Sequence, residues 1–548
     1  MPSAITSERK ASAAPMAARP AKRVPAEPEK VPSGAGMERW LTWTFVALVV
    51  YAGLRAIVAA GLRPLWFDEI CTWNVVRQPG LSGVWNALLA TADGQPPMFY
   101  LVERVPTWFF SKMEYALRLP SVLGFCATLL CIFAWVKTRA GALTAWIAAS
   151  LLLFSPLRDF YAVEARPYAM VTACIAFALV CYQRIERKAY RILFGVTLVF
   201  AASLHYYAIF FVLPFAAAEL SYALTQKRVR AGVWAGLSAT LLPLVVSYPL
   251  VARLKAAQGA NFWARPDFGE TLNVYSWLSG ATSMGLPVGF AGRAAVALSV
   301  ALVLLYLAYR CAKDCRAGAS SLPESVLLLA LFLTPWVMFA AVKLTDGGLT
   351  TRYMVPVGVV VPLVLAQLVR HLSEQARVAV AIALLVSILV FEVAYWSVSY
   401  PLIRDAVPEP AFAELTIQDA KHAELPVLVS NPVDYLQLVY YATPKQRARL
   451  VEPFDTAAQI TYARTDTTEK NLAALAPYIP MNLPQWSEFR TKHSSFLLFT
   501  STAGRDRFDW WIRRFTKEKA GMQLLAGTGA TQVFLVTLPE AAVPGAAK

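Results

Sequence analysis

Two short stretches of this chain concentrate ionisable residues whose types are suited to chemistry at a membrane surface. The first, PLWFDEICTWN, contains the adjacent carboxylates Asp68 and Glu69. The second, SPLRDFYAVEARPYAM, contains Glu164, Arg166 and Tyr168 among other charges of both signs. A carboxylate at the bilayer face can accept a proton from a hydroxyl group or bind a cation. Arginine matches the geometry of phosphate oxygens, so the second stretch predicts a site for an anionic lipid headgroup.

Each of these signals also has an ordinary structural interpretation. Asp68 lies where a helix is expected to begin, so its side chain could instead serve as the N-cap of that helix. The charges of the second stretch could form a salt-bridged surface loop. A further polar break, SLHYYAIFF, contains His205, and a single histidine at a helix break is more often a structural hydrogen-bond donor than a catalytic group.

The composition indicates that a membrane positions these residues. Of 548 residues, 57% are hydrophobic and only 16% are charged, with a mean hydropathy of +0.48. A soluble chain carries roughly a quarter charged residues, so much of this surface faces something other than water. The net charge of +16 is typical of basic cytoplasmic loops in so apolar a chain, and we predict no nucleic-acid partner.

About eleven apolar segments are long enough to be membrane spans. Only helices and closed barrels satisfy the backbone in lipid, and these runs are too uniformly apolar for barrel strands. The predicted fold class is therefore a polytopic α-helical membrane protein with about eleven transmembrane helices. The predicted spans are Trp40–Ala60, Leu119–Val136, Ala142–Phe154, Tyr168–Tyr182, Ile192–Leu204, Ala208–Leu224, Val233–Val251, Ala294–Tyr309, Ser325–Val342, Tyr353–Val369 and Val378–Val398.

The basic residues indicate how the chain crosses the membrane. With the N-terminus in the cytoplasm, every short cytoplasmic loop contains Lys or Arg, as the positive-inside rule requires. Counting Met98–Phe110 as a further span would reverse this agreement, so we expect that stretch to be a helix lying at the outer surface. We therefore predict a multi-pass protein of the cytoplasmic membrane, in contact with membrane lipids, with both ionisable stretches on the outer face.

Three regions follow from these patterns. Residues 1–38 are rich in Ala, Pro, Lys, Arg and Glu and predict a disordered cytoplasmic tail. Residues 39–400 hold the spans, whereas residues 401–548 are of mixed polarity. In the last region LPVLVS, SSFLLFTS and ATQVFLVTL predict strands, and Tyr435–Ala442 and DRFDWWIRRFTKEK predict helices. We expect a small extracytoplasmic α/β domain there.

Six short motifs, read in order, resemble a known group of membrane enzymes. They are WFDE after the first span, QPPMFY, RLPS, EARPY, LHYY and TRYMVP. In their order and shared sidedness they are similar to motifs of the dolichyl-phosphate-mannose protein mannosyltransferases and the bacterial aminoarabinose transferases, which have the GT-C fold. The resemblance covers roughly residues 40–400 and does not extend to the C-terminal region.

This resemblance implies transfer of a sugar from a polyprenyl-phosphate donor to an acceptor hydroxyl on the outer face, with inversion at the anomeric carbon. Asp68 matches the family's catalytic carboxylate and Glu69 its usual neighbour, whereas the acceptor (a glycan, lipid or protein) is left open. Gln95 departs from the family, which has His or Lys there, so the donor class is also open. The implied substrate-binding positions are Gln95, Arg118, Glu164, Arg166, Tyr168, His205 and Arg352, with Arg118 and Arg166 nearest the donor phosphate and Arg352 a further candidate for it.

Two other functional classes remain open: a transporter or flippase of lipid-linked sugars, and a non-enzymatic assembly protein. A transporter predicts polar residues in the middle of spans and inverted repeats, whereas the charges here gather at one face and the chain shows no such repeat. We predict no obligatory cofactor and no metal site, although Asp68 and Glu164 could share a divalent cation.

Overall fold

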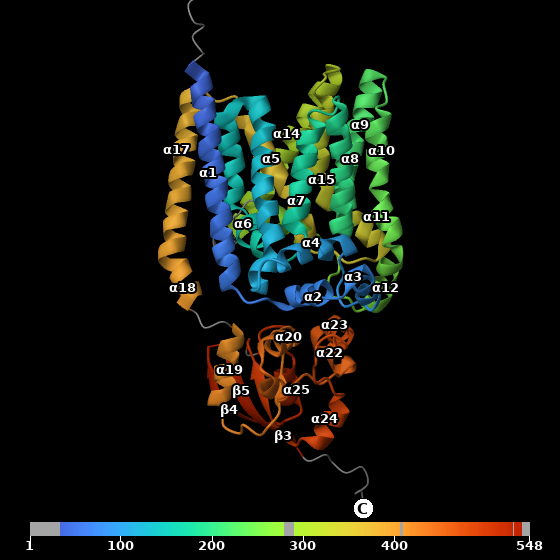
Figure 1. Cartoon of the computed structure of the whole chain (residues 1–548), viewed down its shortest axis with the longest axis vertical. Coiled ribbons are helices and arrows are strands. Elements are labelled where there is room, and N and C mark those ends of the chain that lie inside the picture. Colours follow the sequence, from blue (N-terminus) through green and yellow to red (C-terminus); the bar gives the residue numbers. More distant parts are fainter. Residues whose placement is uncertain (1–32, 279–289, 406–408, 503, 530, 540–548) are drawn as a thin grey trace, which may run out of the picture.

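The computed structural model describes residues 33–278, 290–405, 409–502, 504–529 and 531–539. Figure 1 shows a bundle of long helices standing side by side and a smaller, sheet-containing part beyond one end of the bundle. The predicted fold class, a polytopic helical membrane protein with a small C-terminal α/β part, is confirmed. Most of the predicted N-terminal tail, residues 1–32, lies outside the described residues.

Six described helical segments are long and apolar enough to cross a membrane, and a bent pair of helices gives up to one more. The chain is therefore a multi-pass membrane protein, whereas the total of about eleven crossings stays a prediction. The helices of the bundle are α1 (Ser33–Leu62), α5 (Met113–Ser150), η1 (Leu151–Phe154), α7 (Tyr168–Tyr182), α8 (Lys188–Leu204), η3 (Tyr206–Phe211), α9 (Val212–Gln226), α10 (Ala231–Ala239), α11 (Leu241–Val246), α14 (Phe290–Arg316), α15 (Leu322–Thr345), η4 (Thr351–Val359), α16 (Val360–Val369) and α17 (Glu374–Ala394), which continues as η5 (Tyr395–Ser399) and α18 (Tyr400–Asp405).

The longest apolar segment, Met113–Phe154, is too long for a single straight crossing. Its 42 residues would extend about 63 Å as one straight helix, twice the roughly 30 Å of a bilayer core. The helical geometry breaks at Gly141, where φ is 79° and ψ is 168°. Only glycine adopts this region of backbone conformation readily, so the residue at the break fits its position.

Contacts with α1 show that the chain reverses at Gly141. Before the break, Lys137 donates a hydrogen bond to Thr42, near the start of α1. After the break, Asp159 forms an ion pair with Arg55, near the end of the same helix. The chain thus returns along the bundle after Gly141, in agreement with the two spans predicted in this segment.

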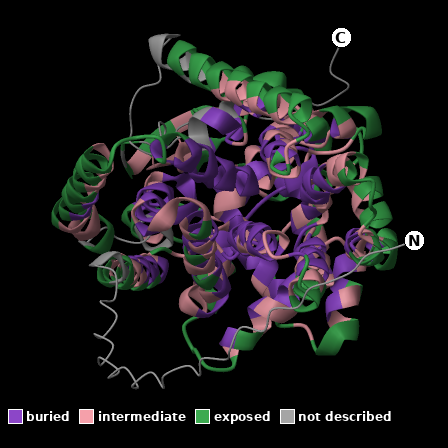
Figure 2. Cartoon of the chain, turned by 90° about the horizontal axis from the view of Figure 1, so that it is seen from above, coloured by how far each residue is buried: buried purple, intermediate pink, exposed green. Residues whose placement is uncertain are grey.

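The bundle carries apolar side chains on its outside as well as in its core. Figure 2 shows the buried residues at the centre of the bundle and the exposed ones along the peripheral helices. The segment containing α17 is the extreme case, because only 11% of its most apolar 18 residues are buried. Its exposed side chains include Ile382, Val390 and Val393. A contiguous apolar surface of this kind is suited to lipid acyl chains and not to water.

One predicted span ends earlier than expected. The stretch Val233–Val251 is divided among α10, α11 and α12 (Tyr248–Gln258), and the chain bends by 56° between Val246 and Tyr248. Pro249 lies in the first turn of α12, where the missing N–H of proline is tolerated, whereas inside a continuous helix it would break the hydrogen-bond ladder.

Short helices connect α1 to α5 and cover one end of the bundle. They are α2 (Phe67–Val76), α3 (Gly80–Leu89) and α4 (Pro97–Thr107), each of 10 or 11 residues, or about 16 Å, too short to cross a bilayer. Figure 1 shows all three between the bundle and the sheet. The prediction that Met98–Phe110 forms a helix that does not cross is therefore confirmed. Further short helices are α6 (Pro156–Asp159), η2 (Tyr161–Val163) and α13 (Phe268–Leu278).

The C-terminal part is built on a five-stranded sheet with the order β2-β1-β3-β5-β4. β1 pairs in parallel with β2 and β3, whereas β5 pairs antiparallel with β3 and β4. The three predicted strands are β1, β3 and β5; β2 is too short, and β4 too rich in glycine, to be predicted. The strands are β1 (Val427–Val429), β2 (Leu450–Val451), β3 (Ser495–Thr500), β4 (Gly521–Thr528) and β5 (Thr531–Thr537).

Helices surround this sheet, and one of them reaches the bundle. The two predicted helices are α20 and α25. In α20 the Gln437 side chain donates to the carbonyl oxygen of Leu65, at 2.9 Å, and the Tyr441 hydroxyl accepts from the Leu65 N–H, at 2.7 Å. Side chains of α20 thus satisfy both backbone groups of Leu65, in the segment that links α1 to α2. The helices are α19 (Glu409–Asp419), α20 (Pro432–Tyr441), α21 (Pro444–Arg447), α22 (Thr456–Ala463), α23 (Thr467–Leu475), α24 (Trp486–Lys492) and α25 (Trp511–Lys517).

We expect Gly141→Ala to destabilise the protein by about 1–3 kcal/mol, because alanine is strained at a φ of 79°. The measurement is the midpoint of thermal unfolding of the purified protein in detergent. Gly36→Ala is the control, since a Cβ at Gly36 meets no atom within 4 Å. Equal midpoints for the two variants would contradict the reversal at Gly141.

Candidate functional site

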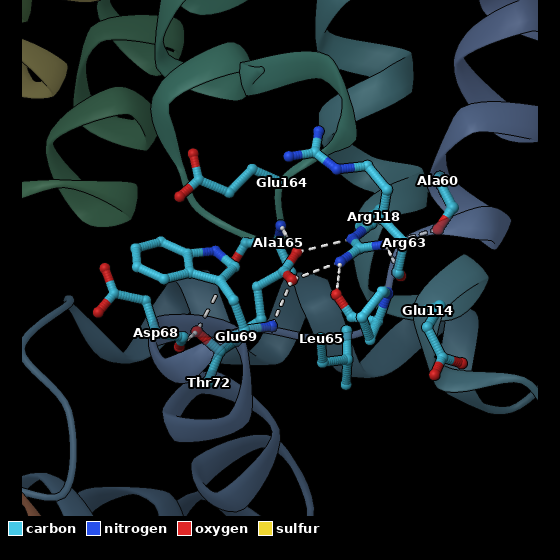
Figure 3. A network of polar contacts seen from close by, with 12 residues as sticks. Ala60, Arg63, Leu65, Asp68, Glu69, Thr72, Glu114, Arg118, Glu164 and Ala165 are labelled. Carbon is cyan, nitrogen blue, oxygen red and sulfur yellow. Dashed lines mark hydrogen bonds and ion pairs between the residues drawn. The ribbon is translucent and has the colours of Figure 1, made fainter. Parts of the chain in front are cut away.

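A buried ion pair between Glu69 and Arg118 lies at the centre of the candidate site (Figure 3). The Arg118 Nε donates to Glu69 Oε1 at 2.7 Å, and Nη2 donates to Glu69 Oε2 at 2.5 Å. Both side chains are almost fully buried, at 2% and 0% exposure. Glu69 also accepts from the backbone N–H of Ala165, at 2.8 Å, and of Trp66, at 3.2 Å. The Glu69 carboxylate thereby joins α2 to the second ionisable stretch. α2 belongs to the segment between α1 and α5, which is called the first loop below.

The rest of the Arg118 guanidinium is also committed to protein oxygens. Nη1 donates to the carbonyl oxygens of Ala60 and Arg63, and Nη2 to that of Pro64. With the two bonds to Glu69, these contacts occupy all five N–H groups that a guanidinium can offer. The sequence predicted that Arg118 binds the donor phosphate, but in this structure it has no N–H group left for a ligand.

Asp68 faces away from that pair and contacts two other arginines. Its Oδ2 accepts from Arg352 Nη1 at 2.5 Å and lies 3.6 Å from Arg166 Nη2. Burial raises the pKa of Asp68, but the opposing effect of Arg352 and Arg166 is greater and holds that pKa below its usual value. The alternative role as helix N-cap is not observed, because the N-cap of α2 is Trp66.

Arg166 is held mainly by Asp93, a residue that the sequence did not single out. Arg166 Nη1 donates to Asp93 Oδ2 at 2.7 Å and to Thr72 Oγ1 at 3.0 Å. Both acidic partners of Arg166 come from the first loop, so this arginine ties the second ionisable stretch to that loop. The sequence could have indicated Asp93, because this residue lies in ADGQPP, two residues before the predicted site residue Gln95.

Glu164 is the carboxyl group of the second ionisable stretch for which the described structure gives no protein partner. Within the described ranges, no hydrogen bond or ion pair engages its half-buried side chain. Burial raises the pKa of Glu164 to about 7, and the charges of Glu69 and Asp68 contribute in the same direction against that of Arg352. In Figure 3 the Glu164 and Asp68 carboxylates both extend to one side of the Glu69–Arg118 pair. Two neighbouring carboxyls whose pKa values are moved in opposite directions are typical of acid–base sites.

Glu164 opens into a cavity of about 420 Å³ between the end of the bundle and the C-terminal part. Arg352 lines this cavity, together with Arg63, which the sequence did not predict. Among the described residues, Arg63 makes a single, long side-chain hydrogen bond, 3.4 Å to the carbonyl oxygen of Asp159. Beside the Glu69–Arg118 pair, the cavity therefore combines one further carboxyl group with two further cationic groups. Its lining is Arg63, Pro64, Trp66, Glu69, Arg118, Phe160, Tyr161, Val163, Glu164, Arg352 and Gln437.

The beginning of the second ionisable stretch fits the structural interpretation instead. Arg158 bonds to Asp159 and to Glu392 of α17, each at 3.0 Å, and Arg55 bonds to the same Glu392 at 3.0 Å. These four charges of balanced sign attach the outermost helix to α1. The stretch thus divides into a salt-bridged half and a half, from Glu164 onward, that faces the site.

Tyr168 and His205, two more of the predicted residues, pack with Tyr353 and do not line the cavity. Tyr168, His205 and Tyr353 are in mutual ring contact, with centroids 5.0–6.3 Å apart. Burial, reinforced by Arg166 and Arg352, lowers the pKa of His205 to about 3. Its Nδ1 accepts from the Tyr207 N–H at 3.2 Å, so His205 has a structural role here as a neutral acceptor, where the sequence predicted a donor.

Two further predictions concern Gln95 and the absence of a metal site. Gln95 is buried and does not line the cavity. Across the part of the chain that the structure describes, no three His, Cys, Asp or Glu side chains are grouped so that they could hold a metal ion. The predicted independence of a metal is a question for activity measurements.

Comparison with known proteins gives matches among solved structures alone. No protein-family model and no curated protein sequence matches the chain. ArnT from Cupriavidus metallidurans bound to undecaprenyl phosphate is 15% identical, with a TM-score of 0.48 over 90% of this chain and 97% of that one. The apo state of that protein gives 14% identity and a TM-score of 0.49, over 90% and 98% of the chains.

The oligosaccharyltransferase AglB from Archaeoglobus fulgidus, in complex with an inhibitory peptide and a dolichol-phosphate, is also similar. It is 11% identical, with a TM-score of 0.44 over 92% of this chain and 75% of that one. ArnT and AglB are GT-C glycosyltransferases, the group that the sequence motifs resemble. At such low identity, the roles of individual residues are inferred from the contacts of this chain itself.

We expect Glu69→Gln to cost about 3–5 kcal/mol of stability, because it leaves the buried Arg118 charge without its counter-ion. Glu164→Gln makes the same chemical change where no protein partner is lost, and should unfold at the wild-type temperature. Thermal unfolding in detergent measures both. A midpoint for Glu69→Gln as high as that for Glu164→Gln would show that the pair is not structural.

Proposed function

We propose that the protein is a membrane glycosyltransferase that moves a sugar from a polyprenyl-phosphate donor to an acceptor hydroxyl, with inversion at the anomeric carbon. The observation that carries this proposal is the 420 Å³ cavity in which Glu164 lies with Arg63 and Arg352, beside the Glu69–Arg118 pair, while Asp68 contacts Arg352. An inverting transfer needs a carboxylate to take the proton of the acceptor and cations to stabilise the departing phosphate. The motif resemblance supports the same reaction.

The donor phosphate in this proposal contacts Arg352 and Arg63, which line the cavity. Arg118 also lines the cavity, but protein oxygens already bind all five of its N–H groups, and Arg166 does not line the cavity. Arg352 pairs with Asp68 through Nη1 alone, so its other N–H groups can bind a phosphate. Arg118 and Arg166 then act as positioning residues that hold the two ionisable stretches together.

Asp68 is the general base in this proposal. Before the donor binds, Arg352 keeps Asp68 ionised. A phosphate that shares Arg352 weakens this ion pair, so the proton affinity of Asp68 rises once the donor is in place. Asp68 then takes the acceptor proton, the acceptor oxygen attacks the anomeric carbon, and polyprenyl phosphate departs from the opposite side with the electron pair of the broken C–O bond. A single displacement of this kind inverts the anomeric centre.

The proposed setting is the outer face of the cytoplasmic membrane, with the N-terminus in the cytoplasm and the C-terminal α/β domain outside. The carboxylates and both cavity arginines lie at the end of the bundle next to the sheet, so donor and acceptor meet on that side. The acceptor, a hydroxyl of a glycan, lipid or protein, reaches the cavity beneath α20, whose Gln437 forms part of the wall.

The test of this function is incubation of the purified protein with polyprenyl-phosphate sugars and measurement of free polyprenyl phosphate. A transferase releases it when an acceptor is present, whereas a flippase or an assembly protein does not. Repeating the reaction in chelator tests the predicted independence of a metal.

We expect Asp68→Asn to lower the transfer rate by roughly two to four orders of magnitude, because a positioned general base contributes about that much. The variant should still fold and insert, since asparagine and aspartate are of equal size, and a cooperative thermal transition in detergent checks this. Asp419→Asn, at an exposed position of α19, is the control and should retain full activity. More than about a tenth of wild-type transfer in Asp68→Asn would remove this residue from the role of base.

Glu164 predicts a pH dependence of donor binding. Because its pKa is about 7, the group is neutral below that pH and negative above it, where it repels a phosphate in the same cavity. The KM for the donor should therefore rise as the pH increases through 7, and Glu164→Gln should keep the low-pH KM throughout. If kcat rises through pH 7 instead, and this rise is lost in Glu164→Gln, Glu164 and not Asp68 is the base.

A further inference from the structure

A second polar cavity lies at the end of the bundle far from the candidate active site. Its volume is about 510 Å³, and its positively charged lining consists of Arg139, Arg310, Lys313 and Arg370. Arg139 comes two residues before the reversal at Gly141, which places the cavity at the opposite end of α1 from Arg63. We propose that this cavity binds the phosphate group of an anionic membrane lipid. The proposal does not depend on the transferase reaction.

The charges that line the cavity do not cancel. Of its two acidic residues, Glu324 is bound by Arg139 Nη2 at 2.8 Å and by Gln367 at 3.3 Å. Asp314 accepts from Ser325 at 2.6 Å and lies 3.9 Å from Arg310 Nη2. Two more positive than negative side chains line the cavity.

Two of the cationic side chains are without carboxylate partners. In the described parts of the chain, no acidic side chain pairs with Lys313 or Arg370. Both side chains are exposed, so together they give the mouth of the cavity a positive potential that attracts an anion.

Two guanidinium groups of the cavity wall have an N–H group that the protein leaves unsatisfied. Arg139 Nη1 and Arg310 Nη1 have no hydrogen-bond partner within the described structure, and their side chains are 23% and 16% exposed. Both atoms are closed off from solvent, so an oxygen in the cavity reaches them only after the guanidinium turns toward it. A buried donor left unsatisfied costs about 1–3 kcal/mol, so an anion whose oxygens match a guanidinium favours that turn.

The surroundings of the cavity favour a lipid as the source of this phosphate. Tyr306 and Tyr309 of α14 also line it, and tyrosines of this kind gather at the membrane–water interface. Below them, toward the middle of the same helix, Leu302 and Leu305 are 57% and 66% exposed. A lipid with its headgroup among the arginines would lay its acyl chains along this apolar face of α14. Basic pockets between membrane helices bind anionic lipid headgroups in this manner.

The test compares lipid binding by the intact protein in detergent, measured by native mass spectrometry with phosphatidylglycerol and phosphatidylcholine of the same acyl chains. We expect phosphatidylglycerol to bind at least about tenfold more tightly, and this preference to disappear in the double variant Lys313→Gln/Arg370→Gln. Neither substitution leaves an acidic side chain without its partner, so the fold is retained, and the midpoint of thermal unfolding checks this. The single variant Arg310→Gln provides an independent second measurement.

Arg316→Gln is the matched control, because Arg316 is an exposed basic residue of the same helix that does not line the cavity. It should keep the preference of the wild type. Persistence of the preference in both the double variant and Arg310→Gln, or its loss in the control, would overturn the proposal. Displacement of phosphatidylglycerol by inorganic phosphate at millimolar concentration would identify a site for free phosphate in place of a lipid.

Discussion

The buried guanidinium of Arg118 is the constraint on which the candidate site depends. A charge removed from water is tolerated only if its partners are complete, and here they are Glu69 and three backbone carbonyl oxygens at the end of α1. The chain can supply those oxygens only if residues 60–64 curve around the arginine. Because Glu69 also binds the Ala165 N–H, the same charge determines where the second ionisable stretch lies.

The two adjacent carboxylates of the first loop consequently have different roles. Successive side chains of a helix point about 100° apart, so when Glu69 is directed at Arg118, its neighbour Asp68 must face elsewhere. It faces Arg352, which comes from the other half of the bundle. Arg352 thus lies between the ionised carboxylate and the cavity. This arrangement couples the occupancy of the cavity to the proton affinity of Asp68 without any movement of the backbone.

Apolar length and charge pattern were sufficient to predict the helical membrane fold, the surface helix α4 and three of the five strands. The motif resemblance named Asp68, Glu164, Arg166 and Arg352, and in the structure Asp68 contacts both of these arginines, while Arg352 and Glu164 line one cavity. The roles of the arginines could not be predicted, because they depend on how many donors each guanidinium has already committed, and the partners of Arg118 are mostly backbone oxygens. Arg63 carried no signal for the same reason, since its importance comes from facing a cavity that distant segments enclose.

The hydrogen bonds of Leu65 have a consequence for biosynthesis. Leu65 lies between α1 and α2, yet its partners Gln437 and Tyr441 follow 372 and 376 residues later. At ordinary rates of translation, about 5–20 residues per second, that interval is roughly 20–75 s. The wall of the cavity is therefore completed only after the last span has been inserted and the C-terminal domain has begun to fold, so a partly made chain has no finished substrate pocket.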